Sequence, residues 1–223
     1  MNVAVLGTGS VGRTVAGTIG SLGHEVRIGT RDVEALMART DDAPTFAEWI
    51  TTVTSVQAMT FKDAATFGEI VFNATSGTAS LEALRAAGAA NLAGKVIVDI
   101  ANPLDFSKGF PPTLSVCNET SLAEQIQAAF PDARVVKTLN TVNASVMVDP
   151  VSVGGGEHDM FMAGDDDDAK RTVESILRDW FGWTRVTDLG DITNARGMEM
   201  YLPLWVRLYG AAGTGAFNIA IVR

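Results

Sequence analysis

Three glycines near the start of the chain have the spacing of a phosphate-binding turn. Residues 7–12 read Gly-Thr-Gly-Ser-Val-Gly, a G-x-G-x-x-G pattern that follows an apolar segment and precedes an amphipathic one. In such a turn, the first glycine permits a tight bend, the second lets the backbone approach a pyrophosphate, and the third allows close helix–sheet packing. The pyrophosphate rests on the helix N-terminus, where free amides and the helix dipole favour an anion. The pattern therefore predicts a dinucleotide site at Gly7, Gly9 and Gly12.

The end of the next apolar segment bears on which dinucleotide binds. In NAD-binding chains an Asp or Glu about 20 residues beyond the glycines binds the ribose 2′-hydroxyl, whereas this chain has Gly29, Thr30 and Arg31 there. A carboxylate would repel a 2′-phosphate, but a hydroxyl and a guanidinium can donate hydrogen bonds to it. The sequence therefore favours NADP over NAD, although Asp32 could pair with Arg31 and weaken its positive charge.

Apolar segments of strand length alternate with helix-like segments, as in a doubly wound α/β fold. The first six are apolar on both faces and predict buried parallel strands. Ser121 and Glu124 have the spacing of a capping box at a helix start. We therefore predict a Rossmann-type fold with a mainly parallel sheet. The expected strands cover residues 3–6, 26–29, 56–61, 70–73, 96–100, 135–139, 159–163 and 184–188, and the expected helices cover 13–22, 33–39, 62–67, 81–87, 122–130 and a stretch from 165–168 to about 180.

The character of the chain changes at Asp191, after which the sequence is apolar on nearly all sides. We expect an NADP-binding domain over residues 1–190 and a small C-terminal helical part over 191–223, which Pro203 should kink or split. A helix without a polar face must be buried against something. Of the two possible positions for Met198, Tyr201 and Trp205, a ligand cleft or a dimer seam, the seam is preferred, so a homodimer is expected.

Composition excludes several kinds of partner. The chain of 223 residues is 47% hydrophobic with a net charge of −9, so we expect no nucleic-acid partner. No apolar run has the length of a membrane helix, and none is expected. A single cysteine, Cys117, excludes an internal disulfide and suits a reducing cytoplasm. The run of four aspartates at 165–168 is better explained as the first turn of a helix than as a metal site.

Side chains for acid–base catalysis are few. Reduction of a carbonyl or imine usually needs a proton donor such as His, Lys or Tyr. The two histidines are His24, for which a structural role is expected, and His158, which is expected to be solvated. Lys137 is either structural or in contact with a cofactor. Hydride transfer between two cofactors requires chiefly that their rings be held together in a dry cleft, so this scarcity favours such a reaction.

Four segments resemble the coenzyme F420-dependent NADP oxidoreductases. They are VAVLGTGSVG at 3–12, LGHEVRIGTRD at 22–32, AGDDDDAKR at 163–171 and LGDITNARGMEMYLPLW at 189–205. The first is general to dinucleotide-binding chains, and the other three together are more specific. The resemblance implies hydride transfer between NADP(H) and the deazaflavin coenzyme F420, a Rossmann domain with a small helical C-terminal part, and a homodimer.

The resemblance also implies the residues of the site. The glycine turn would lie at the pyrophosphate, Thr30 and Arg31 at the 2′-phosphate, and the ends of the fourth and fifth strands at the ribose or nicotinamide. Residues 137–147 would lie near the nicotinamide and the second coenzyme. The expected cofactor-binding residues are Gly7, Thr8, Gly9, Ser10, Val11, Gly12, Thr30, Arg31, Ala74, Thr75, Ser76, Asn102, Pro103 and Asn140.

The chain departs from the archaeal family members at one position. Where they have a histidine, this chain has Asn140, followed by Thr141 and Val142. The Asn-Thr-Val version is similar to the oxidoreductase domain of the STEAP metalloreductases, in which electrons pass from NADPH through a flavin. The acceptor therefore remains open between a deazaflavin and a flavin. Asn140 and Val142 are candidates for contact with the nicotinamide, and no catalytic residue or metal ligand is assigned.

Two other classes of function remain as alternatives. One is an NADPH-dependent reductase of a small metabolite, such as an imine or hydroxy acid. Those enzymes usually have a longer helical substrate domain than the residues after Asp191 provide. The other is a non-catalytic NADP(H)-binding sensor, which would bind the dinucleotide without turnover.

Overall fold

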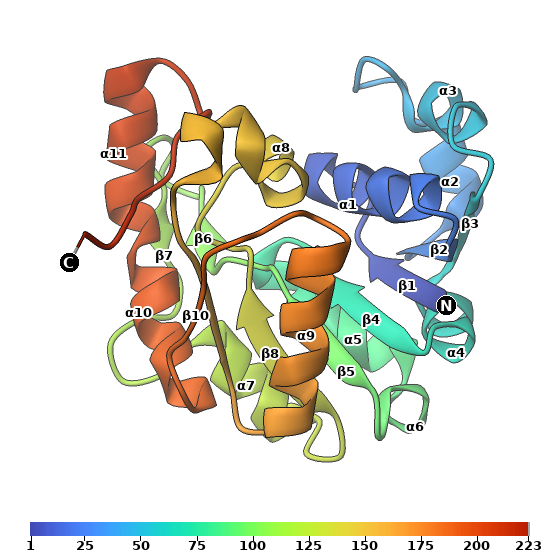
Figure 1. Ribbon diagram of the computed structural model, residues 1–223. Coiled ribbons are helices and arrows are strands. Elements are labelled where there is room, and N and C mark those ends of the chain that lie inside the picture. Colours follow the sequence, from blue (N-terminus) through green and yellow to red (C-terminus); the bar gives the residue numbers. More distant parts are fainter. Residues whose placement is uncertain (223) are drawn as a thin grey trace.

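An eight-stranded sheet forms the centre of the molecule (Figure 1). The computed structural model describes residues 1–222. The strand order is β10-β9-β8-β5-β4-β1-β2-β3, and every neighbouring pair is parallel except β8 with β9. The order reverses between β1 and β4, the topological switch point at which doubly wound sheets bind ligands. The strands are β1 (Asn2–Leu6), β2 (Glu25–Thr30), β3 (Val56–Thr60), β4 (Ile70–Asn73), β5 (Val96–Asp99), β8 (Arg134–Thr138), β9 (Met160–Gly164) and β10 (Val186–Asp188).

Helices cover both faces of this sheet. α1, α8 and α9 lie on one face, and α4, α5 and α7 lie on the other. A separate antiparallel pair, β6 (Leu104–Asp105) with β7 (Thr113–Leu114), follows β5. The helices are α1 (Ser10–Ser21), α2 (Val33–Ala38), α3 (Phe46–Thr51), α4 (Phe61–Phe67), α5 (Ser80–Ala87), α6 (Ala89–Leu92), α7 (Leu122–Ala129), α8 (Ala144–Val148), α9 (Asp167–Asp179), α10 (Ala195–Met200) and α11 (Leu202–Ala212), with short 3-10 turns at Gly77–Ala79, Pro150–Ser152, Gly154–Gly156 and Ile192–Asn194.

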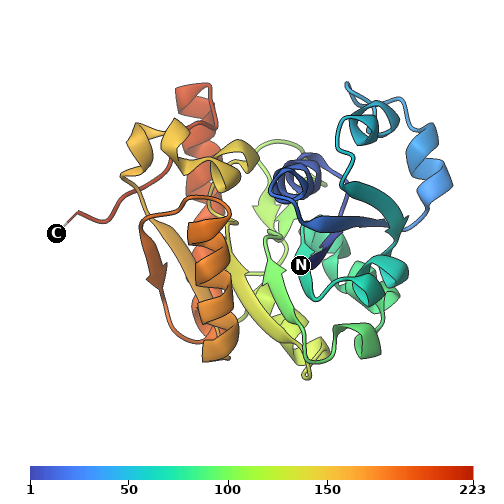
Figure 2. The ribbon, with the colours of Figure 1, turned by 45° about the vertical axis from the view of Figure 1, so that its right-hand side comes forward.

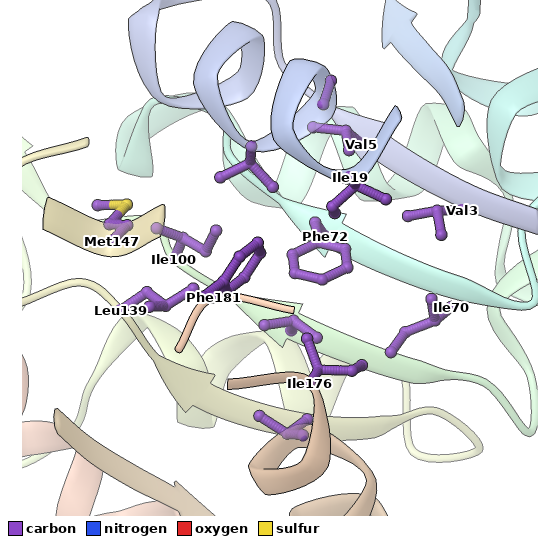
Figure 3. Close-up of a cluster of buried hydrophobic side chains, with 14 of the residues drawn as sticks. Val3, Val5, Ile19, Ile70, Phe72, Ile100, Leu139, Met147, Ile176 and Phe181 are labelled. Atoms are coloured by element: carbon purple, nitrogen blue, oxygen red, sulfur yellow. The ribbon is translucent and has the colours of Figure 1, made fainter. Parts of the chain in front are cut away.

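The alternation of side chains along each strand divides the core into two layers. In β1, Val3 and Val5 belong to the layer beneath α1 and α9, whereas Ala4 and Leu6 belong to the layer beneath α4, α5 and α7. Figure 3 shows the first layer, in which Phe72 of β4 lies among side chains from the sheet and from the helices that cover this face. Because both faces of the central strands are buried, these strands carry continuous apolar runs, as the sequence indicated.

The predicted fold class is confirmed, with differences at the two ends of the sheet. β3 was expected to be buried on both faces. It is instead an edge strand, and Gln57 is exposed. β9 runs antiparallel to β8, and β10 pairs with β9 in parallel. The short α3, α6 and α8 and the β6–β7 pair were not predicted, because segments this short carry little periodicity.

The predicted cap at Ser121 is correct in part. The Ser121 hydroxyl accepts from the amide of Glu124 and so caps α7. The Glu124 carboxylate does not return to the Ser121 amide; it accepts from the Ser121 hydroxyl and from Arg196. A reciprocal capping box occurs instead at Thr45 and Glu48, at the start of α3.

The C-terminal segment divides at Tyr201 into α10 and α11, which agrees with the break expected from Pro203. α10 packs beside β9 and α7, while α11 lies on the side of the molecule away from the N-terminus (Figures 1 and 2). The last residue of the expected segment 191–223, Arg223, lies outside the described residues. Within residues 1–222, the longest apolar helices fall short of what a membrane crossing needs.

Candidate dinucleotide site

The glycine turn joins the end of β1 to the start of α1 at the switch point of the sheet. Gly9 is the residue before α1, no side chain caps this helix, and its first turn holds no acidic residue. The amides in the first turn of a helix have no partner within the helix. They and the positive end of the helix dipole are therefore free to receive an anion.

The three glycines differ in what an added side chain would meet. A Cβ at Gly7 would lie 2.4 Å from the carbonyl oxygen of Ala74, and Gly7 has φ +113°. A Cβ at Gly12 would lie 2.0 Å from the carbonyl oxygen of Gly7. A Cβ at Gly9 would meet nothing within 4 Å. Gly7 and Gly12 are thus required by the protein's own packing, whereas the open space at Gly9 fits an outside ligand that approaches the backbone.

A cavity of about 440 Å³ extends from this turn, and we call it the glycine-turn cavity. Two arginines, Arg31 at the end of β2 and Arg39 after α2, contribute to its lining. The remaining lining residues are Gly7, Thr8, Gly9, Phe61, Ala74, Thr75, Ser76, Ala79, Glu82, Ala83 and Ala86. The two guanidiniums give this cavity the positive charge that a phosphate needs.

The residues around Arg31 are arranged differently from the expectation. The Asp32 carboxylate accepts from the amide of Ala35 and caps α2, so it does not neutralise Arg31. Arg31 is instead 4.0 Å from Glu82 of α5, and both side chains are about three-quarters exposed. The hydroxyl of Thr30 is 3.5 Å from the carbonyl oxygen of Asp32, and Thr30 is not among the lining residues.

A second cavity, of about 600 Å³, lies beside the first and shares Ala74, Thr75 and Ser76 with it. We call it the central cavity. It opens where β1, β4, β5 and β8 end, with α8 and α11 around it. Its lining consists of apolar, hydroxyl and carboxamide side chains: Ser10, Val11, Thr14, Ala74, Thr75, Ser76, Gly77, Ile100, Ala101, Asn102, Leu104, Phe106, Asn140, Val142, Asn143, Ala144, Ser145, Met147, Leu202 and Trp205.

Asn140 connects three segments around the central cavity. Its side-chain amide donates to Asn102 Oδ1 at 2.9 Å and to the carbonyl oxygen of Met198 at 3.1 Å, while Asn102 Nδ2 donates to the Asn140 carbonyl at 2.9 Å. Asn140 Oδ1 is buried and has no hydrogen-bond partner among residues 1–222. The preceding residue, Leu139, is buried with φ +62°, a conformation that is strained for a leucine and often occurs at functional sites.

Lys137 belongs to a buried ion cluster and not to the lining of either cavity. Its Nζ lies 2.9 Å from Asp99 Oδ2 and 2.8 Å from Glu199 Oε1, and it also donates to the carbonyl oxygen of Ala101. Burial disfavours the ammonium, but the two carboxylates outweigh this effect, and the pKa of Lys137 lies above its ordinary value. The sequence left open whether Lys137 is structural or in contact with a cofactor, and its buried ion pairs make it a structural residue.

The cluster continues to the loop between the two cavities. Asp99 Oδ1 accepts from Asn73 Nδ2 at 2.7 Å, which turns Asn73 Oδ1 toward the Thr75 hydroxyl, 2.7 Å away. Because a carboxylate only accepts, Asp99 fixes the orientation of the Asn73 amide. The position of Thr75 is thereby tied to the buried charges.

Most residues expected at the site line one of the two cavities, and three do not. Gly12 is buried behind the turn, while Thr30 and Pro103 lie next to lining residues. Sequence reasoning missed Arg39, Glu82 and the residues from β6. It preferred a dimer seam for Trp205; this residue lines the central cavity, and the seam stays a prediction. Arg39 could have been predicted as a site residue, because it is a basic residue soon after the second strand. No sequence feature of the β6 residues predicts that they line the cavity.

The other charged residues singled out in the sequence have local partners. His24 is half-buried and packs at a tilt against Trp180, with ring centroids 4.3 Å apart. His158 was expected to be solvated, but it is buried, with Nε2 2.9 Å from the Pro150 carbonyl oxygen and Nδ1 2.8 Å from Asn218. In the aspartate run, Asp166 caps α9 and Asp165 accepts from the amide of Ile192. Asp166 thus acts as a helix cap, whereas Asp165 connects the start of α9 to the backbone before α10.

A further hollow, of about 760 Å³, lies at the opposite end of the strands. Its lining includes Glu124, Gln127, Arg134 and Asp165, from α7 and the starts of β8 and α9. Parallel sheets bind their ligands at the carboxyl ends of the strands. The geometry therefore favours the glycine-turn and central cavities as the functional site.

Comparisons with known proteins agree with this geometry. Residues 2–103 match the family described as NADP oxidoreductase, coenzyme F420-dependent. The F420-dependent NADP reductase of Methanothermobacter marburgensis is 29% identical over 212 residues, which cover 93% of this chain and 92% of the relative. Metalloreductase STEAP3 of Rattus norvegicus is 29% identical over 210 residues, or 91% of this chain. The chain spans only 37% of the length of STEAP3.

Two solved structures show different degrees of similarity to this chain. An imine reductase from Streptomyces aurantiacus has a TM-score of 0.61 with 15% identity, covering 96% of this chain and 64% of that chain, and so shares the fold alone. A candidate F420-dependent NADP reductase from Arthrobacter sp. FB24 has a TM-score of 0.97 and 56% identity, and both chains are covered in full. The family indicated by the sequence motifs is thus confirmed: the chain is an oxidoreductase that belongs to the coenzyme F420-dependent NADP oxidoreductases.

Proposed function

We propose that the protein transfers a hydride between NADP(H) and the deazaflavin coenzyme F420. The observation that carries this proposal is the lining of the central cavity, which consists of apolar, hydroxyl and carboxamide side chains. Reduction of a carbonyl or imine calls for a proton donor with a suitable pKa beside the substrate. Neutral walls of this kind suit the transfer of a hydride between two bound rings, for which the protein supplies orientation and a dry surface.

The residues present fit a dinucleotide. The first-turn amides of α1 would bind the pyrophosphate over the open face of Gly9, and Arg31 would bind the 2′-phosphate, with Thr30 beside it. The nicotinamide half would pass Ala74, Thr75 and Ser76, which the two cavities share, and enter the central cavity. When bound, the two cofactors supply the hydride donor and the hydride acceptor.

The walls of the central cavity would hold the reacting rings and exclude water. Met147, Leu202 and Trp205 supply apolar surface. Asn140 Oδ1 and Trp205 Nε1 are buried polar atoms without a partner among the described residues, so they are an available acceptor and an available donor at this wall. Buried polar atoms normally have partners, which supports a role for this pair in orienting a ligand; Asn140 and Val142 would then be the residues near the nicotinamide.

The proposal is tested with purified protein, NADPH and oxidised coenzyme F420, by following the visible absorbance of the deazaflavin. We expect rapid loss of absorbance with NADPH and much slower loss with NADH. Parallel reactions contain NADPH with FMN, FAD or a cyclic imine. Turnover with a flavin alone would mean that the acceptor is a flavin, in agreement with the asparagine at position 140. Turnover with the imine alone would mean that the protein is a reductase of a small metabolite.

Binding of NADPH without turnover in any of these reactions would favour the sensor alternative. To establish this, NADPH binding is measured separately by the change in its fluorescence. If NADPH does not bind at all, the assignment of the glycine-turn cavity is wrong.

We also propose that residues 191–223 form a dimerisation segment on an NADP-binding domain of residues 1–190. α11 exposes Leu204, Leu208 and Tyr209, with Leu204 55% exposed. Apolar side chains gathered on one helix commonly mark a protein contact, and a second copy of this chain is the partner that the family resemblance implies. The cytoplasmic location expected from the lone cysteine stays a prediction.

A further inference from the structure

Arg39 contributes to the glycine-turn cavity from a segment that the glycine motif does not include. It follows the last turn of α2 and lines the cavity together with Arg31. Its Nε lies 3.0 Å from Asp41 Oδ1 and its Nη2 lies 2.9 Å from Asp41 Oδ2, a bidentate pair on the protein surface. This pair occupies one edge of the guanidinium, which has five N–H donors in all, so the other edge keeps donors for an anion.

The segment that carries Arg39 is fixed to the glycine turn by Arg13. Arg13 Nε donates to the carbonyl oxygen of Thr8 at 3.0 Å, and its two other nitrogens donate to the Pro44 carbonyl at 2.9 Å and to Asp42 at 2.6 Å. The Arg13 side chain is only 12% exposed. Because one buried guanidinium holds both the turn and the 42–44 segment, the position of Arg39 relative to the turn is set by the fold.

Each arginine of the cavity faces a carboxylate of the same chain. Arg31 lies 4.0 Å from Glu82, and Arg39 is paired with Asp41 and lies 3.9 Å from Asp42. The hydrogen bonds from Arg39 hold the pKa of Asp41 below its ordinary value, so this pair stays ionised at neutral pH. A phosphate dianion offers more charge than a carboxylate and also forms bidentate bonds with arginine. It can therefore draw on Arg39 in competition with Asp41.

We propose that Arg39 is a second residue that selects NADP(H) over NAD(H) by binding the 2′-phosphate, and that the Asp41 carboxylate weakens this contact. The inference rests on the proposed NADP(H) site and names a contact that the glycine motif and the end of β2 do not supply. Arg31 and Arg39 would hold the phosphate from two sides of the cavity, while Asp41 keeps the affinity below the maximum that two arginines could give.

The test measures binding and does not depend on turnover. The probes are adenosine 2′,5′-bisphosphate and AMP, which differ only in the 2′-phosphate, each titrated by calorimetry. Arg39→Ala should weaken binding of the bisphosphate on the order of tenfold and leave AMP within about twofold, as expected for one lost charge-assisted contact. The matched control is Arg171→Ala on α9. Arg171 is also an exposed arginine that pairs with a nearby aspartate, Asp168, but it does not line either cavity.

The second variant tests the role of Asp41. Asp41→Asn should strengthen bisphosphate binding by roughly threefold to tenfold, because the Arg39 donors lose an ionised competitor. The same change in an Arg39→Ala background should have little effect. Thermal melting of each variant establishes that it is folded, which is expected because both side chains are at least half exposed.

The outcomes separate this inference from the proposed function. Failure of the unaltered protein to prefer the bisphosphate over AMP would refute the NADP(H) site itself. If the unaltered protein shows that preference and Arg39→Ala keeps it, only the role of Arg39 is wrong. An Asp41→Asn variant that binds the bisphosphate more weakly would overturn competition by Asp41.

Discussion

Removal of the Lys137 ammonium should destabilise the protein severely, because two buried carboxylates share it. Lys137, Asp99 and Glu199 are at most 1% exposed, and both acids lie within 2.9 Å of the same nitrogen. Removing one partner of a buried pair costs about 3–5 kcal/mol. The carboxylates keep other donors: Glu199 accepts from the amides of Leu122 and Ala123, and Asp99 accepts from Asn73. We therefore expect Lys137→Met to cost about 3 kcal/mol of unfolding free energy.

The measurement is urea unfolding followed by circular dichroism, with Lys95→Met as the matched control. Lys95 is a partly buried lysine whose ammonium donates to the Ala65 carbonyl oxygen, 2.7 Å away. The loss of this single neutral contact should cost about 1 kcal/mol. A second change, Glu199→Gln in the Lys137→Met background, should recover part of the loss because one uncompensated charge is removed. Equal costs for the two lysines, or no recovery, would refute the reasoning.

The pH dependence follows from the direction of the pKa shift. A group whose pKa is raised on folding stabilises the protein below its unfolded pKa and loses this contribution as the pH rises through the folded value. For Lys137 the ordinary value is 10.5 and the folded pKa is higher. The contribution is therefore constant through the neutral range and falls only above pH 10.5. The cost of Lys137→Met in urea unfolding should therefore be the same at neutral pH and at mildly alkaline pH.

Three further predictions concern the site and the assembly. Gly12→Ala should lower the melting temperature, because its Cβ would lie 2.0 Å from the Gly7 carbonyl oxygen. Gly9→Val should leave the melting temperature nearly unchanged and abolish NADPH binding. A Gly9→Val variant that binds NADPH normally would contradict the proposed dinucleotide site. Arg31→Ala should weaken NADPH binding by about 1.5 kcal/mol and leave NADH unchanged, as measured by fluorescence titration, and an equal loss for both would remove Arg31 from the 2′-phosphate. Leu204→Asp with Leu208→Asp should give monomers in light scattering, while Val151→Asp, at another exposed apolar residue, should not; an unchanged mass would show that α11 is not the interface.

The sequence alone determined the order of the elements and the place of the dinucleotide turn. Five strands and their helices follow from apolar runs that are buried on both faces, and these runs must lie inside a parallel sheet covered by helices. The glycine spacing and the absence of a carboxylate at the end of β2 are local features, which a linear pattern contains in full. Gly9 and Arg31 were therefore predicted as site residues, and they line the glycine-turn cavity.

Only the tertiary structure decided which distant side chains meet. Lys137, Asp99 and Glu199 come from β8, the end of β5 and α10, and nothing in their separate surroundings shows that they form one buried cluster. Trp205 lines the central cavity because α11 packs beside the strand ends, and Arg39 reaches the other cavity because Arg13 holds the following segment against the glycine turn. Such contacts depend on how elements pack against one another, whereas periodicity in a sequence reports only which side of each element is buried.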